Sequence, residues 1–507
     1  MKYKYQLIFI SVVFILFTSC SKKDYDLKIV DTILNDKSNY FYIDFAEYKN
    51  IDADLPIGIF DSGTGGLTVF DAIVNYDQHN NSTNEFSFFG DSTRDFSKEH
   101  FIYLADQANM PYGNYESVNK TKLLKEHILK DVQFLLDKKY YKTAEDLDYQ
   151  KDKSRIKALV IACNTATAFG IRDIENFIKE AGIDIKVIGV IGAGVKAALE
   201  TINEDDDAAI AILATAGTVA SNGYPNEIKR QLKMKNLKNN IAIYQQAGIG
   251  LAGAIDGVID YIDNNASSPR LEYKGPSDKN DKLKIDVNLL ERYNFDWTEN
   301  KMLYNGNINS PQGIQINSVE NYISYYVTSL MEQLIISEEK TKLKSIILGC
   351  THYPFYTEIF KSKIDWLRNY KENENFIYKD FMEDEITFID PAVYTAKELY
   401  NYLNANKLFT NSSLDKSEFY ISVPNISNKN VDIDKSGNFT YDYKYGRDAD
   451  IIQQYVKRVP FSRMNIPEET ISRLSETIPY TFELISNFNM NNNKTSFLKD
   501  EEKIVTE

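Results

Sequence analysis

One pattern recurs along the chain and limits the folds it can adopt. A short apolar run ends in small or polar turn residues, and residues at helical spacing follow it. The runs are LPIGIF (55–60), ALVIAC (158–163), IKVIGVI (185–191), AAIAILA (208–214), SIILG (345–349) and ITFI (386–389). After the first run, Leu67, Phe70, Ile73 and Val74 share one helical face. Strands that alternate with helices predict a parallel sheet and therefore an α/β fold.

Segments between and beyond these units differ in composition. The 507 residues are enough for two or three domains. Residues 262–315 are rich in Asn, Asp, Lys, Ser, Pro and Gly, which indicates a surface insertion. Outside the repeated pattern we expect a tether with a first element at 21–54, a C-terminal extension at 406–488 and a disordered tail at 489–507.

The net charge argues against one class of partner. Acidic residues number 73 against 58 basic ones, which gives a formal charge of −15. Proteins that bind nucleic acid need a basic footprint on their surface. We therefore expect no nucleic-acid partner.

The N-terminus has the pattern of an export signal. In MKYKYQLIFISVVFILFTSC, two lysines precede an apolar run that is too short to span a bilayer comfortably. Small residues before Cys20 resemble the bacterial lipobox, in which this cysteine is lipidated and becomes the mature N-terminus. The interpretation is a signal at 1–20 and an exported, membrane-anchored lipoprotein. The alternative is a signal-anchor helix with an incidental cysteine.

Two further cysteines follow predicted strands. Cys163 and Cys350 lie at strand ends and at the starts of predicted helices, and Thr351 is a good N-cap. The carboxyl ends of parallel strands are where α/β proteins bind ligands. Unpaired N–H groups and the helix dipole there favour a thiolate. A disulfide between the two is the alternative for an exported protein.

Two other polar residues accompany the thiols. His352, two residues after Cys350, can exchange a proton with it or with a substrate. Asp61 ends the first strand, and Gly63, Gly65 and Gly66 after it allow a tight turn and a close ligand. A phosphate-binding P-loop is excluded because no lysine follows these glycines.

These groups suit one reaction in particular. Inverting a carbon that bears hydrogen, without a cofactor, needs a base on one face and a conjugate acid on the other. Two cysteines supply two similar groups for such symmetric chemistry.

At this point the sequence resembles the glutamate racemases of the aspartate/glutamate racemase superfamily. The resemblance rests on IGIFDSGTGGLTV (57–69), DQANMPYG (106–113), VIACNTATA (160–168), VIGVIGAGVKAA (187–198), ILATAGTVASNGY (212–224), ILGCTHYPF (347–355) and IDPAVYTAKEL (389–399). CTHYP and PYG are typical of the glutamate branch. Matching positions cover residues 56–258 and 340–405.

The resemblance implies a fold and a set of roles. It implies two parallel-sheet α/β domains, one at 55–192 and 352–405 and the other at 193–351, with the active site in the cleft between them. Cys163 and Cys350 would be the acid/base pair, acting on the D- and L-enantiomers, and Asp61 and His352 would assist them. Substrate would be held by Asp61, Ser62, Pro111, Tyr112, Gly113, Asn164, Thr165, Thr215, Thr218, Thr351 and His352. No metal or other cofactor is implied; the small-molecule partner would be glutamate, and a homodimer is one assembly to test.

The sequence also departs from this family. The family usually has Cys-Pro and a downstream Glu after the strand near 241–246, whereas YQQAGIGLAGAIDG lacks the Cys and Pro and offers Asp256 as a loose match to the Glu. Insertions near 77–101 and 262–315, the C-terminal extension and the export signal are also atypical.

Two other functions stay open at this stage. One is a non-catalytic protein that binds an amino acid or a peptidoglycan fragment on a racemase scaffold. The other is a racemase for aspartate. Both cysteines, Asp61 and His352 favour catalysis, because a binding protein needs no thiol pair.

Overall fold

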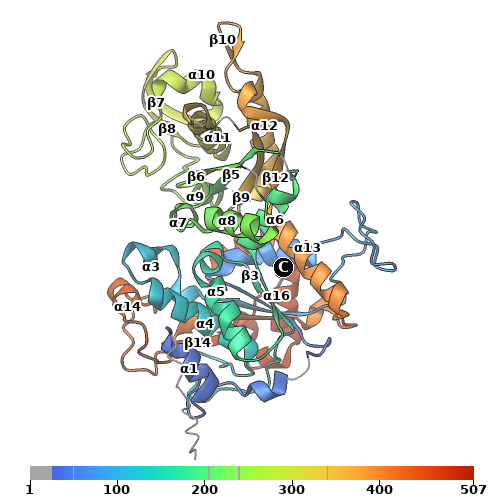
Figure 1. Cartoon of the computed structure of the whole chain (residues 1–507). Coiled ribbons are helices and arrows are strands. Elements are labelled where there is room, and N and C mark those ends of the chain that lie inside the picture. The colour runs from blue at the N-terminus through green and yellow to red at the C-terminus, as the bar shows by residue number, and fades with distance from the viewer. Residues whose placement is uncertain are drawn as a thin grey trace, which may run out of the picture.

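The computed structural model describes residues 26–48, 51–203, 206–237, 240–337, 339 and 341–506. Two α/β lobes lie one above the other in Figure 1, and each is built on its own sheet. The predicted signal and Cys20 lie outside the described residues. Among the residues that the structure does describe, no helix is both long enough and apolar enough to span a bilayer.

The first domain is built on a six-stranded sheet in the order β14-β13-β2-β1-β3-β4. Its strands are β1 (Ile57–Asp61), β2 (Phe101–Ala105), β3 (Ala158–Ile161), β4 (Lys186–Gly189), β13 (Glu418–Pro424) and β14 (Val456–Pro460). All neighbours are parallel except β13 and β14. Because helices cover both faces, β1, β2 and β3 are fully buried and almost entirely apolar.

Helices form two layers around this sheet. One layer contains α2 (Leu67–Val74), α13 (Pro391–Asn406), α15 (Glu468–Thr477) and α16 (Pro479–Asn491). The other contains α1 (Lys28–Asn35), α3 (Gly113–Ser117), α4 (Thr121–Leu136), α5 (Asn164–Glu180) and α14 (Tyr441–Gly446).

The second domain is built on a four-stranded parallel sheet in the order β12-β9-β5-β6. Its strands are β5 (Ala208–Ala214), β6 (Ile241–Ala247), β9 (Leu343–Gly349) and β12 (Met382–Ile389). One face is covered by α9 (Leu251–Ile255), α11 (Val319–Ile336) and α12 (Thr357–Asn369), and the other by α6 (Val190–Glu200) and α8 (Gly223–Lys235). The short elements are α7 (Ala216–Ala220), α10 (Leu290–Tyr293), the hairpin β7 (Met302–Asn307) and β8 (Ser310–Ile316), and the pair β10 (Lys371–Glu372) and β11 (Asn375–Phe376).

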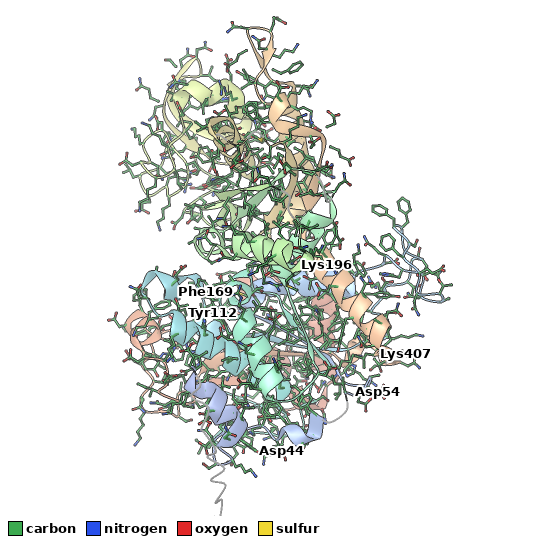
Figure 2. All side chains as sticks on the ribbon, viewed as in Figure 1. Asp44, Asp54, Tyr112, Phe169, Lys196 and Lys407 are labelled. Carbon is green, nitrogen blue, oxygen red and sulfur yellow. The ribbon has the colours of Figure 1, made fainter. Side chains whose placement is uncertain are left out.

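Helices α6 and α13 pack against each other where the domains meet. Figure 2 places Lys196 of α6 at this junction. The six predicted strands are confirmed, since each predicted run overlaps β1, β3, β4, β5, β9 or β12. The α/β class with two parallel sheets is confirmed as well.

The predicted domain boundary after Cys350 is wrong. The resemblance places residues 352–405 in the first domain, but α12 buries Phe360, Ile364 and Leu367 in the second core. Strand β12 then pairs in parallel with β9, with Phe388 opposite Ile346. The second domain therefore consists of residues 190–389, and the first of 26–189 and 391–506.

The predicted C-terminal extension and disordered tail are also wrong as separate units. Strand β13 pairs with β2, so residues 418–460 complete the first sheet. Residues 489–506 pack on the same domain, where Ile504 is only 1% exposed and its N–H donates to Asn489 Oδ1 (2.9 Å). Burial of apolar side chains holds this segment in place.

The predicted tether and insertion are also packed. Ile29 and Ile33 of α1 are fully buried in the first domain, so this helix is not part of a tether. In residues 262–315, Ile285 and Ile314 are buried in the second core. The insertion is therefore part of that domain and not a loose surface loop.

Candidate active site

Two strand ends from different domains meet in the cleft. Strand β3 is followed by Cys163 and Asn164, and β9 ends at Gly349 before Cys350. The Asn164 side-chain amide donates to the Gly349 carbonyl (3.3 Å), and Tyr224 donates its hydroxyl proton to Asn164 Oδ1 (3.0 Å). These bonds hold the two cysteine-bearing turns next to each other.

Cys163 is the N-cap of α5. Its Sγ accepts from the Ala166 N–H (3.4 Å) and lies 3.6 Å from Ser62 Oγ, to which the thiol can donate. Burial, together with the negative charge of Asp61, raises the pKa of Cys163 to about 12, although the bonds from Ala166 and Ser62 oppose this. At neutral pH this thiol holds its proton.

Asp61 lies beside Cys163 at the end of β1. Its Oδ2 accepts from the backbone N–H groups of Gly63 (3.1 Å) and Gly66 (2.9 Å). A Cβ on Gly66 would lie only 2.4 Å from the Asp61 Cβ, so the glycine is needed for this close turn. Burial raises the pKa of Asp61, and these N–H donors partly offset the rise.

Cys350 has a different ionisable partner. Its Sγ lies 3.6 Å from His352 Nδ1, while His352 Nε2 lies 3.2 Å from Asp256 Oδ1. Burial disfavours charge on the imidazole, but its bonds to Asp256 and Cys350 outweigh burial and raise the pKa of His352 to about 10. A protonated imidazole therefore faces the second thiol. Asp256 also pairs with Arg473 Nη1 at 3.0 Å.

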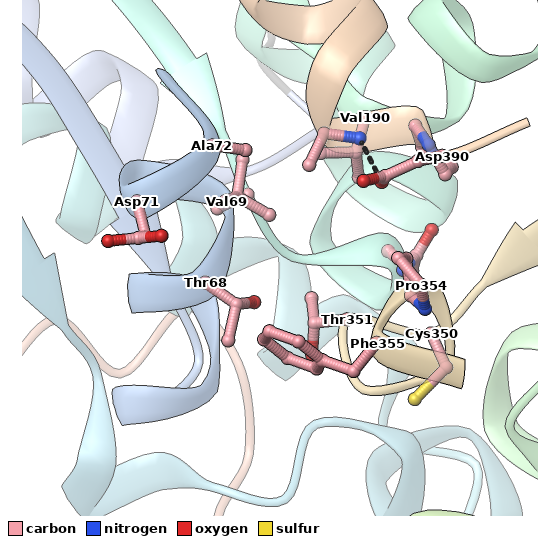
Figure 3. A pocket seen from close by; sticks show the side chains of 14 residues that line it. Thr68, Val69, Asp71, Ala72, Val190, Cys350, Thr351, Pro354, Phe355 and Asp390 are labelled. Carbon is pink, nitrogen blue, oxygen red and sulfur yellow. Dashed lines mark hydrogen bonds between the residues drawn. The ribbon is translucent and has the colours of Figure 1, made fainter. Parts of the chain in front are cut away.

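A pocket of about 230 Å³ opens beside these turns. Figure 3 shows Thr351 and Phe355 of the second domain next to Thr68 of α2, and Cys350 also lines the pocket. Asn164 and Ala162 line it from the first domain, whereas Cys163 between them does not. The volume suits a small molecule.

Several predicted substrate-binding residues surround this region. Thr215 caps α7, accepting from the Thr218 N–H (3.4 Å), and the two hydroxyls lie 3.0 Å apart. A Cβ on Gly217 of this turn would lie 3.5 Å from the Gly113 Cα, so the turn touches the loop that ends at Gly113. Thr351 Oγ1 lies 3.4 Å from His352 Nδ1. Thr165 is half-buried in the first turn of α5.

Tyr112 differs from the prediction. Its hydroxyl donates to Asp106 Oδ2 (2.6 Å) and lies 2.7 Å from Asp131 Oδ2, and its side chain is buried inside the first domain. This phenol therefore supports the loop and does not reach the pocket. The Pro111 carbonyl accepts from Tyr445 of α14 (3.3 Å), which fixes the same loop from behind.

Some residues of the site lay beyond the sequence prediction. Arg473 is separated from Asp256 by more than 200 residues, and no motif marks it. Asp390 lines the pocket and caps α13; burial raises its pKa to about 6. An Asp before Pro at a strand end is an N-cap signal that could have identified Asp390.

The alternative of a disulfide does not hold, because Cys163 and Cys350 are both free thiols. Within the described ranges, no cluster of three or more His, Cys, Asp or Glu side chains is arranged to hold a metal ion.

Comparison with known proteins gives consistent relatives. The chain is 25% identical over 361 residues to a glutamate racemase of Oceanobacillus iheyensis, covering 71% of this chain and 84% of that protein. A glutamate racemase of Lactobacillus helveticus is 24% identical over 368 residues, covering 72% of this chain and 87% of the relative. The chain is thus similar to glutamate racemases over most of its length. No family model matches it.

Other glutamate racemases match more locally or in structure. A glutamate racemase of Levilactobacillus brevis is 35% identical over 173 residues, which is 34% of this chain and 46% of the relative. The solved glutamate racemase of Francisella tularensis in complex with D-glutamate has a TM-score of 0.40 and 20% identity, covering 79% of this chain and 98% of that one.

The arrangement of the two thiols allows proton transfer at two sites. Each thiol has its own ionisable neighbour, a carboxyl for Cys163 and an imidazole for Cys350. The neighbours come from the same domain as the thiol they serve. The cleft therefore holds two acid/base pairs, one from each domain.

Proposed function

We propose that this chain is a cofactor-independent racemase that interconverts L- and D-glutamate with Cys163 and Cys350 as the two acid/base groups. The observation that carries the proposal is the Asn164–Gly349 bond, which holds the two cysteine turns together across the cleft. Similarity to curated glutamate racemases supports glutamate as the substrate.

The proton balance of the reaction follows from these pairs. In the direction from L to D, the Cys350 thiolate removes the α-proton and leaves a carbanion. The Cys163 thiol donates its own proton to the opposite face, which completes the inversion. The raised pKa of Cys163 keeps it protonated for this step at neutral pH. For the reverse direction Asp61 accepts the proton of Cys163 and protonated His352 gives a proton to Cys350, so the thiols exchange roles. After the step, solvent carries the proton from Asp61 back to His352.

The expected result of the direct test is exchange of the α-hydrogen. Incubating the protein with L- or D-glutamate in D₂O under reducing conditions should place deuterium at Cα and produce the other enantiomer, measured by mass spectrometry and circular dichroism. A chelator or a carbonyl reagent should leave the rate unchanged. Exchange of aspartate alone would make this an aspartate racemase. Exchange of neither amino acid by folded protein would support the binding-protein alternative.

We also propose that the protein is exported and lipidated at Cys20, where it would contribute to D-glutamate supply for peptidoglycan. The lipobox-like residues before Cys20 support this location. The homodimer stays a prediction.

Anchoring is tested by fractionation. The mature protein is expected in the membrane fraction, released by detergent but not by salt, because lipoprotein processing adds the second acyl chain that stable anchoring needs. Cys20→Ala should give unprocessed or soluble protein. A mature-sized, detergent-dependent product from Cys20→Ala would contradict lipidation.

A further inference from the structure

Arg473 connects the C-terminal part of the chain to the second domain. It lies on α15, whose Ile471 and Leu474 are buried in the first-domain core. From this anchored helix, Arg473 Nη1 reaches Asp256 Oδ1 at 3.0 Å, just after α9 of the second domain. The ion pair therefore joins the two domains.

The same carboxylate oxygen faces the candidate catalytic histidine. Asp256 Oδ1 lies 3.2 Å from His352 Nε2, and the opposite ring nitrogen of His352 lies 3.6 Å from Cys350 Sγ. A continuous chain of contacts runs from Arg473 to the thiol. Burial favours the neutral form of Asp256, but His352 and Arg473 outweigh it and lower the pKa, so Asp256 stays a carboxylate.

The Arg473–Asp256 ion pair contributes little to folding stability. The side chains of Arg473 and Asp256 are 33% and 29% exposed, and ion pairs open to solvent contribute little to folding. The energetic effect of Arg473 should instead appear at the imidazole that shares its carboxylate.

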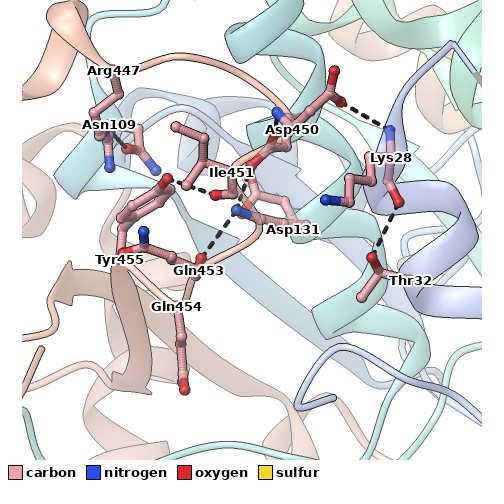
Figure 4. Close-up of polar contacts among 12 residues, drawn as sticks. Lys28, Thr32, Asn109, Asp131, Arg447, Asp450, Ile451, Gln453, Gln454 and Tyr455 are labelled. Atoms are coloured by element: carbon pink, nitrogen blue, oxygen red, sulfur yellow. Dashed lines mark hydrogen bonds and ion pairs between the residues drawn. The ribbon is translucent and has the colours of Figure 1, made fainter. Parts of the chain in front are cut away.

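Other contacts from the C-terminal part reach the first-domain loop that ends at Gly113. Lys444 Nζ donates to the Met110 carbonyl (2.6 Å), and Arg447 Nη2 donates to Asn109 Oδ1 (3.1 Å). Figure 4 shows Arg447 beside Asn109. These residues hold the loop that touches the Gly217 turn, so the C-terminal part supports both sides of the site.

We propose that Arg473 is a positioning residue that holds Asp256 against His352 and thereby orients the imidazole toward Cys350. The C-terminal part of the chain thus completes the active site when the domains are together. The effect on turnover rests on the proposed racemase function. The effect on the reactivity of the Cys350 thiol does not depend on that function.

The first experiment measures thiol reactivity and needs no turnover. Arg473→Gln is expected to slow iodoacetamide alkylation of Cys350 about three- to tenfold at neutral pH, because a misoriented imidazole assists the thiolate less. Alkylation of Cys163 should not change. Arg473→Lys keeps the charge and should recover at least half of the loss. Glu468→Gln is the matched control: Glu468 lies on the same helix, its only ion pair in the described part of the chain is with Arg463 before the helix, and the variant should react like the wild type.

A double-mutant cycle tests whether Arg473 acts through Asp256. Asp256→Asn should slow Cys350 alkylation as Arg473→Gln does, and the double variant should be no slower than Asp256→Asn alone. Additive losses would contradict action through Asp256. Equal Cys350 reactivity in Arg473→Gln and the wild type, with the same thermal unfolding, would overturn the inference.

Turnover separates this inference from the proposed function. If the wild type racemises glutamate, Arg473→Gln should lower kcat about 5- to 20-fold and change KM less than about twofold, the pattern of an interaction that matters in the transition state. A higher KM with unchanged kcat would contradict positioning. If the wild type has no racemase activity, the proposed function fails, and the alkylation result alone decides the role of Arg473.

Discussion

Replacing either Cys163 or Cys350 with serine is expected to lower racemase turnover by about 10²- to 10⁴-fold, the range that one acid/base group contributes. A serine hydroxyl neither ionises readily nor returns a proton as a thiol does. Each direction of the reaction needs one group as base and the other as acid, so both variants should fail in both directions. Circular dichroism with L- and with D-glutamate measures these rates.

The two thiols should behave as one unit. Because inversion needs both thiols, removing one already abolishes the reaction. The double variant should therefore be little slower than either single variant. Both single variants should keep the thermal unfolding midpoint of the wild type and should still bind glutamate in calorimetry. Substantial turnover by Cys163→Ser or by Cys350→Ser would remove that residue from the mechanism.

Phe419→Ala is expected to lower the free energy of unfolding by about 3–5 kcal/mol, the usual cost of emptying a buried phenylalanine site. Phe419 lies on β13, is fully buried, and its ring packs against Phe70, Phe461 and Phe488. If the C-terminal part were a detachable extension, this loss would not reach the racemase activity. Because β13 pairs with β2 in the first sheet, activity and fold should instead be lost together on heating or in urea.

The matched control for Phe419→Ala is the same change on the surface. Phe89 is 88% exposed in the 77–101 insertion, so Phe89→Ala removes the same atoms without opening a cavity. Its unfolding curve should overlay that of the wild type. A Phe419→Ala protein as stable as Phe89→Ala would show that β13 is not part of the first core.

The sequence predicted what local patterning controls. Strands buried on both faces need continuous apolar runs, and such runs located β1, β3, β5 and β9 without reference to any partner. The turns after β3 and β9 followed directly, so both cysteines were found at strand ends. Asp61 and His352 were found in the same way, because each lies at or just after the end of a predicted strand.

Pairing between distant segments was not predictable in this way. ITFI reads as a strand, but nothing in its composition says which sheet it joins, and this led to the wrong domain boundary. In β14, Lys457 and Arg458 are almost fully buried through bonds to the Ala144 carbonyl and to Asp131, so a buried strand looked polar. Arg473 and Asp256 meet only because α15 packs on the first domain beside the second domain.

The interleaved path of the chain fixes the order in which its parts can mature during synthesis. The second domain is one uninterrupted segment, residues 190–389, and all its strands precede β13 along the chain. The first sheet pairs Ile102 with Glu418, so its edge waits for a partner more than 300 residues downstream. Domains that fold as units fold when their last element emerges, and distant pairings are slow to form. The nascent protein therefore keeps an open sheet edge until its final segment arrives, and the cleft, which needs both domains, is the last feature to form.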